Sequence, residues 1–303
     1  MITALMQSSV LFMLMVTGFS LGKLKIMTNF KELSKLVVDV SLPALIIMSM
    51  QKEFSKETAT QALTMLGVSL AVYAGTLIVA YILPIFYKNI TQEERGVHRF
   101  AMSFSNVGFM GFPIANAFLG SASLFYVAMY NIPFQILAFS IGIWFIAPKQ
   151  TVSSNISKKL LYNPAIISAF LGFILFLLQI KLPLPLFSFL TLLGETTTPL
   201  AMLIVGGILS QITIISALQN KYIWITSLYR LLIYPLVLSV LLKAVGFRDY
   251  AVPILIGAMP VAANTSMLAE VYGGDSASAS GLVMLSTMLS SLSIPLLALI
   301  LTL

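Results

Sequence analysis

The sequence contains no cysteine and a single histidine, His98. The missing cysteines exclude disulfide bonds, thiolate nucleophiles and cysteine-ligated metals, and one histidine excludes a multi-histidine metal site or a Ser-His-Asp triad. Charged residues make up only 9% of the 303-residue chain, against roughly 25% in an ordinary soluble domain. So little charge cannot keep a globule of this size hydrated, so lipid must be its main solvent. The composition also excludes a disordered chain and a nucleic-acid partner, and we expect His98, in a charged stretch at 88–99, to lie at the surface.

Most of the chain consists of apolar residues. They make up 59% of the chain, and the mean hydropathy is +1.00. A membrane-spanning helix needs about 20 mostly apolar residues, because the hydrocarbon layer is ~30 Å thick. The apolar runs are continuous rather than alternating, which favours helices over barrel strands. The first run lacks a basic stretch and a cleavage site, so we interpret it as a helix and not a signal peptide. The sequence therefore predicts an all-α polytopic membrane protein with ten transmembrane helices, at about residues 4–21, 36–51, 61–86, 100–119, 124–146, 164–180, 186–209, 222–242, 251–272 and 277–302.

Lysine and arginine are unevenly divided between the two sides of such a bundle. One set of connections carries eleven of them and the other set five. Cytoplasmic loops are enriched in these residues, so we expect the richer set in the cytoplasm and both termini outside. The eleven are Lys23, Lys25, Lys31, Lys35, Lys88, Arg95, Arg99, Lys149, Lys158, Lys159 and Lys221, and the five are Lys52, Lys56, Lys181, Lys243 and Arg248.

Two sequence patterns occur once in each half of the chain. An acid stands four residues before a proline in mid-helix at 39–43 and again at 195–199, and a Pro-Asn pattern at 111–116 has a counterpart at 258–264. Five helices are an odd number, so a second copy must enter the membrane from the opposite side. Inverted repeats of this kind characterise secondary transporters whose site lies between the repeats. The sequence therefore predicts two inverted five-helix repeats, residues 1–150 and 151–303.

The acid–proline pattern has a chemical meaning in lipid. Proline inside a helix pushes away the carbonyl four residues before it, so Pro43 and Pro199 would free the carbonyls of Asp39 and Glu195. Freed backbone groups need partners in hydrocarbon. A carboxylate beside a loosened carbonyl can bind a proton or a cation, so we predict that these four residues couple transport to an ion. The alternative is a tilted helix whose acid pairs with Arg230 or with a hydroxyl.

The fourth and ninth predicted helices carry glycine and proline near their centres. We expect each helix to break, with Pro113 and Pro260 beginning new half-helices. Two half-helix N-termini facing each other offer amide N–H groups and positive potential, which suits an anion. The alternative is two ordinary proline kinks whose asparagines bond neighbouring helices. The predicted substrate-binding residues are Asn106, Gly111, Pro113, Ile114, Asn116, Pro260, Val261 and Asn264.

Arg230 is the one cation well inside a predicted span. An intramembrane charge costs ~2.5–3.5 kcal/mol on lenient scales, so Arg230 should face protein or water. We expect it to be the charge partner of Glu195 or Glu270, with contact to an anionic substrate as the alternative.

Two segments of this sequence resemble the auxin efflux carrier family. The first is Asn-Val-Gly-Phe-Met-Gly-Phe-Pro at 106–113, and the second is Met-Pro-Val-Ala-Ala-Asn at 259–264, which continues through 272–275 and 285–290 to Pro295. The resemblance extends over essentially the whole chain. The family includes plant PIN-FORMED carriers and many bacterial carriers of small carboxylates such as malate or malonate.

The resemblance implies a fold like that of sodium/proton antiporters and bile-acid symporters, in which helices four and nine cross at their prolines. It also implies that helices 1, 2, 6 and 7 form a scaffold that can build a homodimer, and that helices 3–5 and 8–10 form a moving transport unit with the substrate beside the crossing. The connection at 147–163 is short where plant members often have a long regulatory loop. This difference points to a prokaryotic carrier.

The sequence thus predicts a secondary transporter of a small mono- or dicarboxylate that works by elevator-like alternating access in the cytoplasmic membrane of a prokaryote. The coupling ion of such a symporter would be H⁺ or Na⁺. We expect no cofactor, no metal site and no enzymatic activity, because the chain offers no acid–base constellation. The alternatives are an anion channel and a cation/proton antiporter without an organic substrate; the lack of an Asp-Asp pair at the crossing argues against the antiporter.

Overall fold

The computed structural model describes residues 2–147, 162–211, 219–247 and 250–301. Within these ranges the chain is helical apart from its connections and one isolated bridge between Ser105 and Val261, which confirms the predicted all-α class. The α-helices are α1 (Ile2–Lys23), α2 (Phe30–Leu36), α3 (Leu42–Ser49), α4 (Lys56–Ile82), α5 (Gln92–Ser103), α6 (Phe112–Leu119), α7 (Ser123–Leu137), α8 (Ile143–Ile146), α10 (Pro164–Leu177), α11 (Leu184–Glu195), α12 (Thr197–Gln211), α14 (Lys221–Leu228), α15 (Tyr234–Ala244), α16 (Ala251–Gly257), α17 (Thr265–Tyr272) and α18 (Ser276–Leu301). Short π-turns η1 (Val37–Ser41), η3 (Val107–Gly111), η4 (Ala138–Gly142) and η5 (Tyr229–Ile233), and the 3₁₀ turn η2 (Leu83–Phe86), continue several of them.

Five helical stretches of the described chain are long and apolar enough to cross a membrane, which fits a polytopic membrane protein. Three further apolar helices are shorter, at Ser9–Lys23, Val107–Leu119 and Pro164–Leu177. The five long stretches are Lys56–Phe86, Ser121–Ile146, Leu184–Gln211, Lys221–Ala244 and Ser276–Leu297.

Breaks in the chain explain why two predicted spans are not single long helices. α5 ends at Ser103 and helix resumes at Val107, while α16 ends at Gly257 and α17 begins at Thr265. Pro260 lies inside the second break, before α17, so it does not begin a half-helix as expected. The break in the fourth predicted span precedes Pro113, and the expectation that Pro113 begins a half-helix is also wrong. That proline lies inside a continuous helix that starts at Val107.

Widened helical turns accommodate several of the prolines. A π-turn holds one residue more than an α-turn, so it relieves the clash between a proline ring and the carbonyl four residues before it. The helix then bends and continues instead of ending. Three π-turns end two residues before a proline. They are Val37–Ser41 before Pro43, Val107–Gly111 before Pro113 and Tyr229–Ile233 before Pro235.

Glycines allow α1 and α12 to pack backbone against backbone. A Cβ built at Gly18 would overlap the Leu203 carbonyl, and one at Gly206 would overlap the Met15 carbonyl. Small residues permit such close approach of membrane helices, where dispersion replaces the hydrophobic effect as the source of association. The backbones of α1 and α12 are therefore closely packed along this contact.

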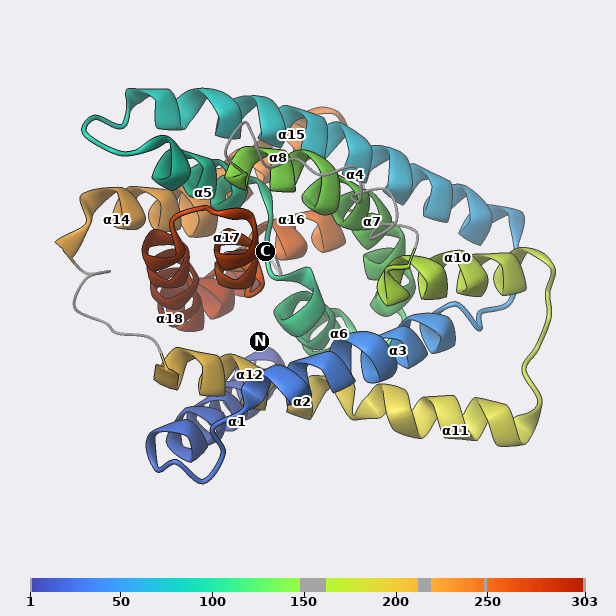
Figure 1. Ribbon diagram of the computed structural model, residues 1–303. Helices are drawn as coiled ribbons and strands as arrows, with labels where there is room; N and C mark the ends of the chain where they lie inside the picture. The colour runs from blue at the N-terminus through green and yellow to red at the C-terminus, as the bar shows by residue number, and fades with distance from the viewer. Residues whose placement is uncertain (1, 148–161, 212–218, 248–249, 302–303) are drawn as a thin grey trace.

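The helices are arranged on two sides of the crossing segments. α1, α2, α3, α11 and α12 lie together at the bottom of Figure 1, and α4 and α15 lie at the top, with α6 and α16 between them. α3 packs against α10 and α11, α4 against α7, and α14 against α18. The breaks in the fourth and ninth spans therefore lie inside the bundle.

Candidate functional site

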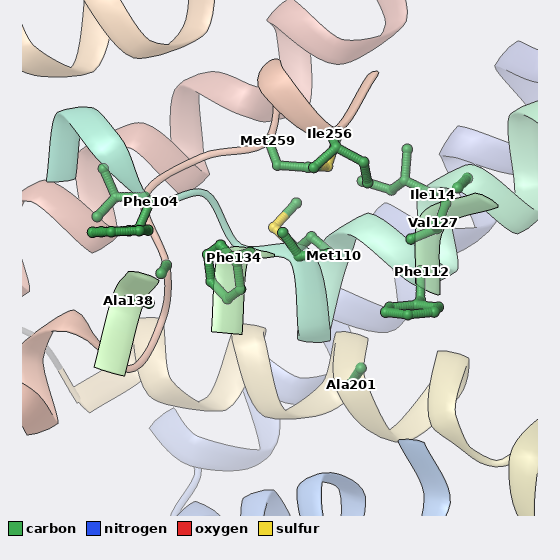
Figure 2. Packing of buried hydrophobic residues seen from close by; sticks show 14 of the residues in the cluster. Phe104, Met110, Phe112, Ile114, Val127, Phe134, Ala138, Ala201, Ile256 and Met259 are labelled. Atoms are coloured by element: carbon green, nitrogen blue, oxygen red, sulfur yellow. The ribbon is translucent and has the colours of Figure 1, made fainter. Parts of the chain in front are cut away.

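The two broken spans meet in a short antiparallel crossing of extended chain. The Asn106 N–H donates to the Pro260 carbonyl at 2.8 Å, and the Ala262 N–H donates to the Phe104 carbonyl at 3.2 Å. Phe104, Ser105 and Val261 are fully buried at this point. Apolar side chains such as Phe104, Met110, Ile256 and Met259 surround the crossing (Figure 2). Hydrogen bonds between the segments thus satisfy backbone groups that the broken helices leave free, as an apolar interior requires.

Asn106 lies at the point where the chain leaves this crossing and enters the helix Val107–Leu119. Its Oδ1 accepts a hydrogen bond from the Phe109 N–H at 3.2 Å, so the side chain caps the helix. Its Nδ2 is buried and has no hydrogen-bond partner, whereas the Ser105 hydroxyl beside it faces the Tyr73 hydroxyl. An unpartnered buried donor is costly unless something binds it. The Asn106 amide is therefore the donor at this helix N-terminus that a ligand could use.

The second broken span approaches the crossing from the other half of the chain. Asn264 precedes α17 and is half-buried, without a side-chain cap. The Val261 N–H donates to the Ser286 hydroxyl at 3.1 Å, which ties the crossing to α18. A second helix N-terminus thus begins a few residues beyond the crossing.

The remaining predicted residues of the fourth span lie further along the helix. Gly111 faces α16, where a Cβ would approach Ile256 Cδ1 to 2.9 Å. Pro113 is buried, and Ile114 lines a small apolar void between α1, α6, α12 and α18. Asn116 is exposed near the far end of α6. Only Asn106 of the predicted residues in this span lies at the crossing itself.

Arg230 lies directly behind the crossing and is 1% exposed. Its Nη1 donates to the Met102 carbonyl at 3.0 Å and its Nε to the Met259 carbonyl at 3.3 Å. Its guanidinium lies 4.7 Å from the centroid of the Tyr234 ring. Met102 lies in the last turn of α5 and Met259 lies two residues beyond the end of α16, so the cation compensates the negative C-terminal ends of both half-helices.

The expected carboxylate partner of Arg230 is not found. Glu195 and Glu270 are both exposed, and no ion pair among the described residues includes Arg230. The guanidinium instead satisfies backbone carbonyls that the broken helices expose. Sequence alone could not suggest this, because those carbonyls become free only where the helices end.

The two acid–proline segments touch each other, and Leu42 of the first also lies beside Gly108, close to the crossing. The hydroxyls of Ser41 and Thr196 are 2.8 Å apart, and a Cβ at Gly194 would lie 3.0 Å from Leu45 Cα. Asp39 and Glu195 are exposed. Pro43 follows the π-turn η1, whereas Pro199 lies in the first turn of α12, just after a bend at Thr196. The structure therefore brings the two predicted segments together but keeps their acids apart from the crossing.

The predicted surface position of the single histidine is wrong. His98 is fully buried on α5, where we expected a surface loop. The charged residues of the region 88–99 suggested a surface loop, but those of α5 lie on one face of an amphipathic helix. The other face of this helix places Val97, His98 and Phe100 in the core.

These groups define a chemical preference. Asn106 supplies an unpartnered amide donor at a helix N-terminus, and Arg230 binds the carbonyls at the C-terminal ends of α5 and α16. No cluster of three or more His, Asp and Glu side chains able to hold a metal ion exists in the part of the chain that the structure describes. Discontinuous helices that meet inside a bundle and point their N-termini at a shared site are typical of secondary transporters of anionic substrates.

Comparison with known proteins agrees with this class. Residues 3–298 match the family described as "Membrane transport protein". The chain is 24% identical over 270 residues to "Putative malonate transporter" of Rhizobium meliloti (strain 1021), which covers 85% of this chain and 82% of that protein. It is 26% identical over 256 residues to "Uncharacterized transporter MJ1031" of Methanocaldococcus jannaschii, covering 80% of each. The protein belongs to this family of membrane transporters, the auxin efflux carrier family that its motifs resemble.

Proposed function

We propose that the protein is a secondary transporter that carries a small organic anion, a mono- or dicarboxylate, by elevator-like alternating access. The observation that carries the proposal is the buried, unpartnered amide of Asn106 at the start of the helix 107–119. A substrate carboxylate would accept a hydrogen bond from this amide. The malonate named for the Rhizobium relative is a dicarboxylate of this chemistry.

The second broken helix would complete the site. Asn264 and the N-terminus of α17 would approach the substrate from the opposite half of the chain, with Pro260 and Val261 holding the crossing backbone. The other predicted residues, Gly111, Pro113, Ile114 and Asn116, would shape the helix that carries Asn106 and its contact with α16.

The proposed architecture has ten spans in two inverted halves, 1–150 and 151–303. Helix packing supports it, because α1 packs on α12 and α3 packs on α10. In the proposed repeat α1 corresponds to α10, and α3 corresponds to the seventh span, which contains α12. The contact of α1 with α12 and that of α10 with α3 are then equivalent by the repeat symmetry. The scaffold would consist of α1–α3 and α10–α12 and would form a homodimer, and the other helices would move with the substrate. Both termini would lie outside the cytoplasmic membrane of a prokaryote.

Charge sets what the carrier needs from a coupling ion. A negative-inside potential of 100 mV drives a monoanion outward by ~2.3 kcal/mol. Export therefore needs no coupled cation, whereas uptake does, and H⁺ or Na⁺ would supply it. Asp39 and Glu195, with Pro43 and Pro199, are candidates for that coupling. Both carboxylates are exposed, so a coupling ion could reach them.

The test is counterflow of labelled mono- and dicarboxylates, malonate included, into proteoliposomes. We expect saturable flux for at least one of them. Asn106→Ser keeps an oxygen that can cap the helix but removes Nδ2, so the carboxylate KM should rise about tenfold or more, the cost of one hydrogen bond to a charge. Saturable flux would be absent for every carboxylate if the proposal were wrong.

Asn163 offers a matched control. It caps α10 through Oδ1, as Asn106 caps its helix, but it lies away from the crossing. Asn163→Ser should leave the KM unchanged. Equal KM changes in the two variants would show that lost capping, rather than a lost substrate contact, accounts for the effect.

A further inference from the structure

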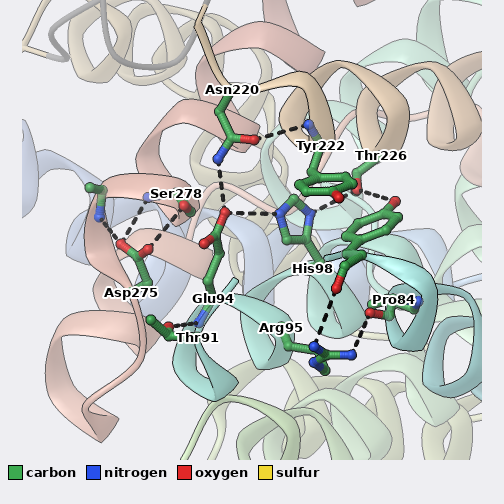
Figure 3. A network of polar contacts seen from close by, with 12 residues as sticks. Pro84, Thr91, Glu94, Arg95, His98, Asn220, Tyr222, Thr226, Asp275 and Ser278 are labelled. Carbon is green, nitrogen blue, oxygen red and sulfur yellow. Dashed lines mark hydrogen bonds and ion pairs between the residues drawn. The ribbon is translucent and has the colours of Figure 1, made fainter. Parts of the chain in front are cut away.

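His98 is held on one side by a fixed hydrogen bond. Its Nδ1 lies 2.8 Å from the Thr226 hydroxyl of α14, and the Tyr87 hydroxyl lies 3.1 Å from the same oxygen. The Tyr87 ring meets the imidazole edge-on, with centroids 5.1 Å apart, and stacks on the Tyr222 ring. The imidazole therefore cannot turn without breaking contacts with two other elements (Figure 3).

The other imidazole nitrogen faces a carboxylate. His98 Nε2 is buried and has no hydrogen-bond partner, and Glu94 Oε1 lies 3.7 Å from it. The Asn220 amide donates to the same oxygen at 2.8 Å and fixes it. The pKa of the Glu94 carboxyl lies below its ordinary value, first because of His98 and then because of Asn220, although partial burial acts the other way. A proton on Nε2 would turn this contact into an ion pair.

Other charged groups around α5 have different partners. Arg95 donates to the carbonyls of Pro84, Ile85 and Tyr87, and Asp275 is held by Ser278 and by the Ala277 N–H. Among the described residues only Glu94 lies at ion-pair distance from His98. The other titratable groups on α5, on the elements packed against it and on the adjoining connections are Lys56, Glu57, Tyr73, Tyr81, Tyr87, Lys88, Glu93, Arg95, Arg99, Lys221, Tyr222, Tyr229, Arg230, Glu270, Tyr272 and Asp275.

The helices α5 and α14–η5 connect the His98–Glu94 pair to the crossing. His98 and Met102 lie one turn apart on α5, and Thr226 and Arg230 lie one turn apart on the helix α14–η5. His98 contacts Thr226, and the Met102 carbonyl accepts from Arg230. Two contacts one turn apart therefore join these helices, and the second of them borders the crossing. A charge added at His98 therefore acts on the pair of helices whose next contact, between Arg230 and the Met102 carbonyl, borders the crossing.

We propose that His98 and Glu94 form a proton-binding site linked to the anion site, so that the carrier takes up its carboxylate with H⁺ bound at His98 Nε2. This rests on the proposed function and assigns it a coupling ion. The added positive charge favours a bound anion, and by linkage the anion favours the proton. The pair lies by the connection 87–91, on the side that the basic loops place in the cytoplasm.

The single histidine makes the proton site directly observable. Protein labelled with isotopic histidine and purified by a tag without histidine gives one imidazole NMR signal, whose pH titration reports His98. Glu94→Gln removes the anionic partner and should lower the titration midpoint. Glu93→Gln, an exposed neighbour on the same turn, should leave it unchanged. Equal midpoints in the two variants would overturn the proton site.

Two measurements test whether proton binding at His98 is linked to carboxylate binding. Malonate, or another carboxylate that shows counterflow, should raise the His98 midpoint in the wild type and have no such effect in Asn106→Ser. The KM for that carboxylate should be roughly fivefold or more lower at about pH 6 than at about pH 8, and His98→Gln should remove this dependence. A midpoint indifferent to a transported carboxylate, or a pH dependence lost only in Asp39→Asn with Glu195→Gln, would overturn the linkage. If the wild type carries no carboxylate at all, the proposed function fails and the linkage with it, while the Glu94 comparison still decides the proton site.

Discussion

Arg230 shows how one residue can set the electrostatic character of a site, although it forms no ion pair with a carboxylate among the described residues. Its two hydrogen bonds go to the carbonyl ends of α5 and α16, which belong to different halves of the chain. A backbone end of this kind is a partial negative charge, and a second anion near it would be repelled. By neutralising both ends, Arg230 leaves the unpartnered Asn106 amide as the main polar group of the crossing.

The role of Arg230 predicts a large and specific loss of stability. Arg230→Met leaves two buried carbonyls unsatisfied, and two charge-assisted hydrogen bonds correspond to about 3–6 kcal/mol. We expect a clearly lower melting temperature of the detergent-solubilised protein, and partial recovery in Arg230→Lys, which keeps the charge.

Glu195→Gln and Glu270→Gln serve as controls for this prediction. Both side chains are exposed, so neither variant should change the melting temperature. A loss in either variant as large as that in Arg230→Met would instead support the ion pair that the sequence suggested.

At the scale of elements, the contact between α1 and α12 depends on glycines. The spacing of Gly18 and Gly22 on α1 is the small-xxx-small pattern of close helix packing, and it was a signal available in the sequence. Gly206 and Gly207 provide the matching surface on α12, where Gly207 accommodates the Phe30 ring and Gly206 the α1 backbone. This pair lies in the proposed scaffold.

Matched glycine substitutions test this packing. Gly206→Ala places a methyl group against the Met15 carbonyl, so we expect a loss of about 1–3 kcal/mol, measured as a lower melting temperature. Gly75→Ala on α4 meets nothing within 4 Å and should be neutral or stabilising, because alanine favours helix. Similar melting temperatures for the two variants would contradict a close α1–α12 contact.

For the whole molecule, the central issue is which helices move together. Ser41 and Thr196 both belong to the proposed scaffold, and their hydroxyls touch. Gly108 belongs to the proposed transport unit, and a Cβ there would lie 3.6 Å from Leu42 Cδ2 in the scaffold. The chain lacks cysteine, so introduced pairs have no competing thiols.

Cross-linking therefore distinguishes a moving unit from a rigid bundle. A disulfide between Ser41→Cys and Thr196→Cys should leave counterflow largely intact, because it joins two parts of one body. A short dithiol-reactive bridge between Leu42→Cys and Gly108→Cys should stop counterflow, and cleavage of the bridge should restore it. Equal flux through both cross-linked proteins would reject the elevator-like division.

Much of the fold was predictable because it depends on local composition. Apolar runs separated by charged connections indicated the membrane class, and Pro164–Leu177 begins where the sixth run was expected. The crossing was foreseen in the correct pair of helices, since 104–106 and 260–262 lie within the predicted fourth and ninth spans. Its position in the fourth span was missed, because Pro113 was expected to begin the half-helix, whereas a π-turn lets the helix that starts at Val107 continue through Pro113.

The sequence by itself determined that this protein belongs in lipid, which segments are apolar, and that two patterns recur in its halves, because these properties follow from residue type and spacing. Only the tertiary structure decided where the helices break, which carbonyls bind Arg230, and that His98 is buried against Glu94. Each of these depends on contacts between residues far apart in the chain, such as Asn106 with Pro260 and His98 with Thr226. Local patterns carry no information about those contacts, so the chemistry of the crossing appears only in the folded protein.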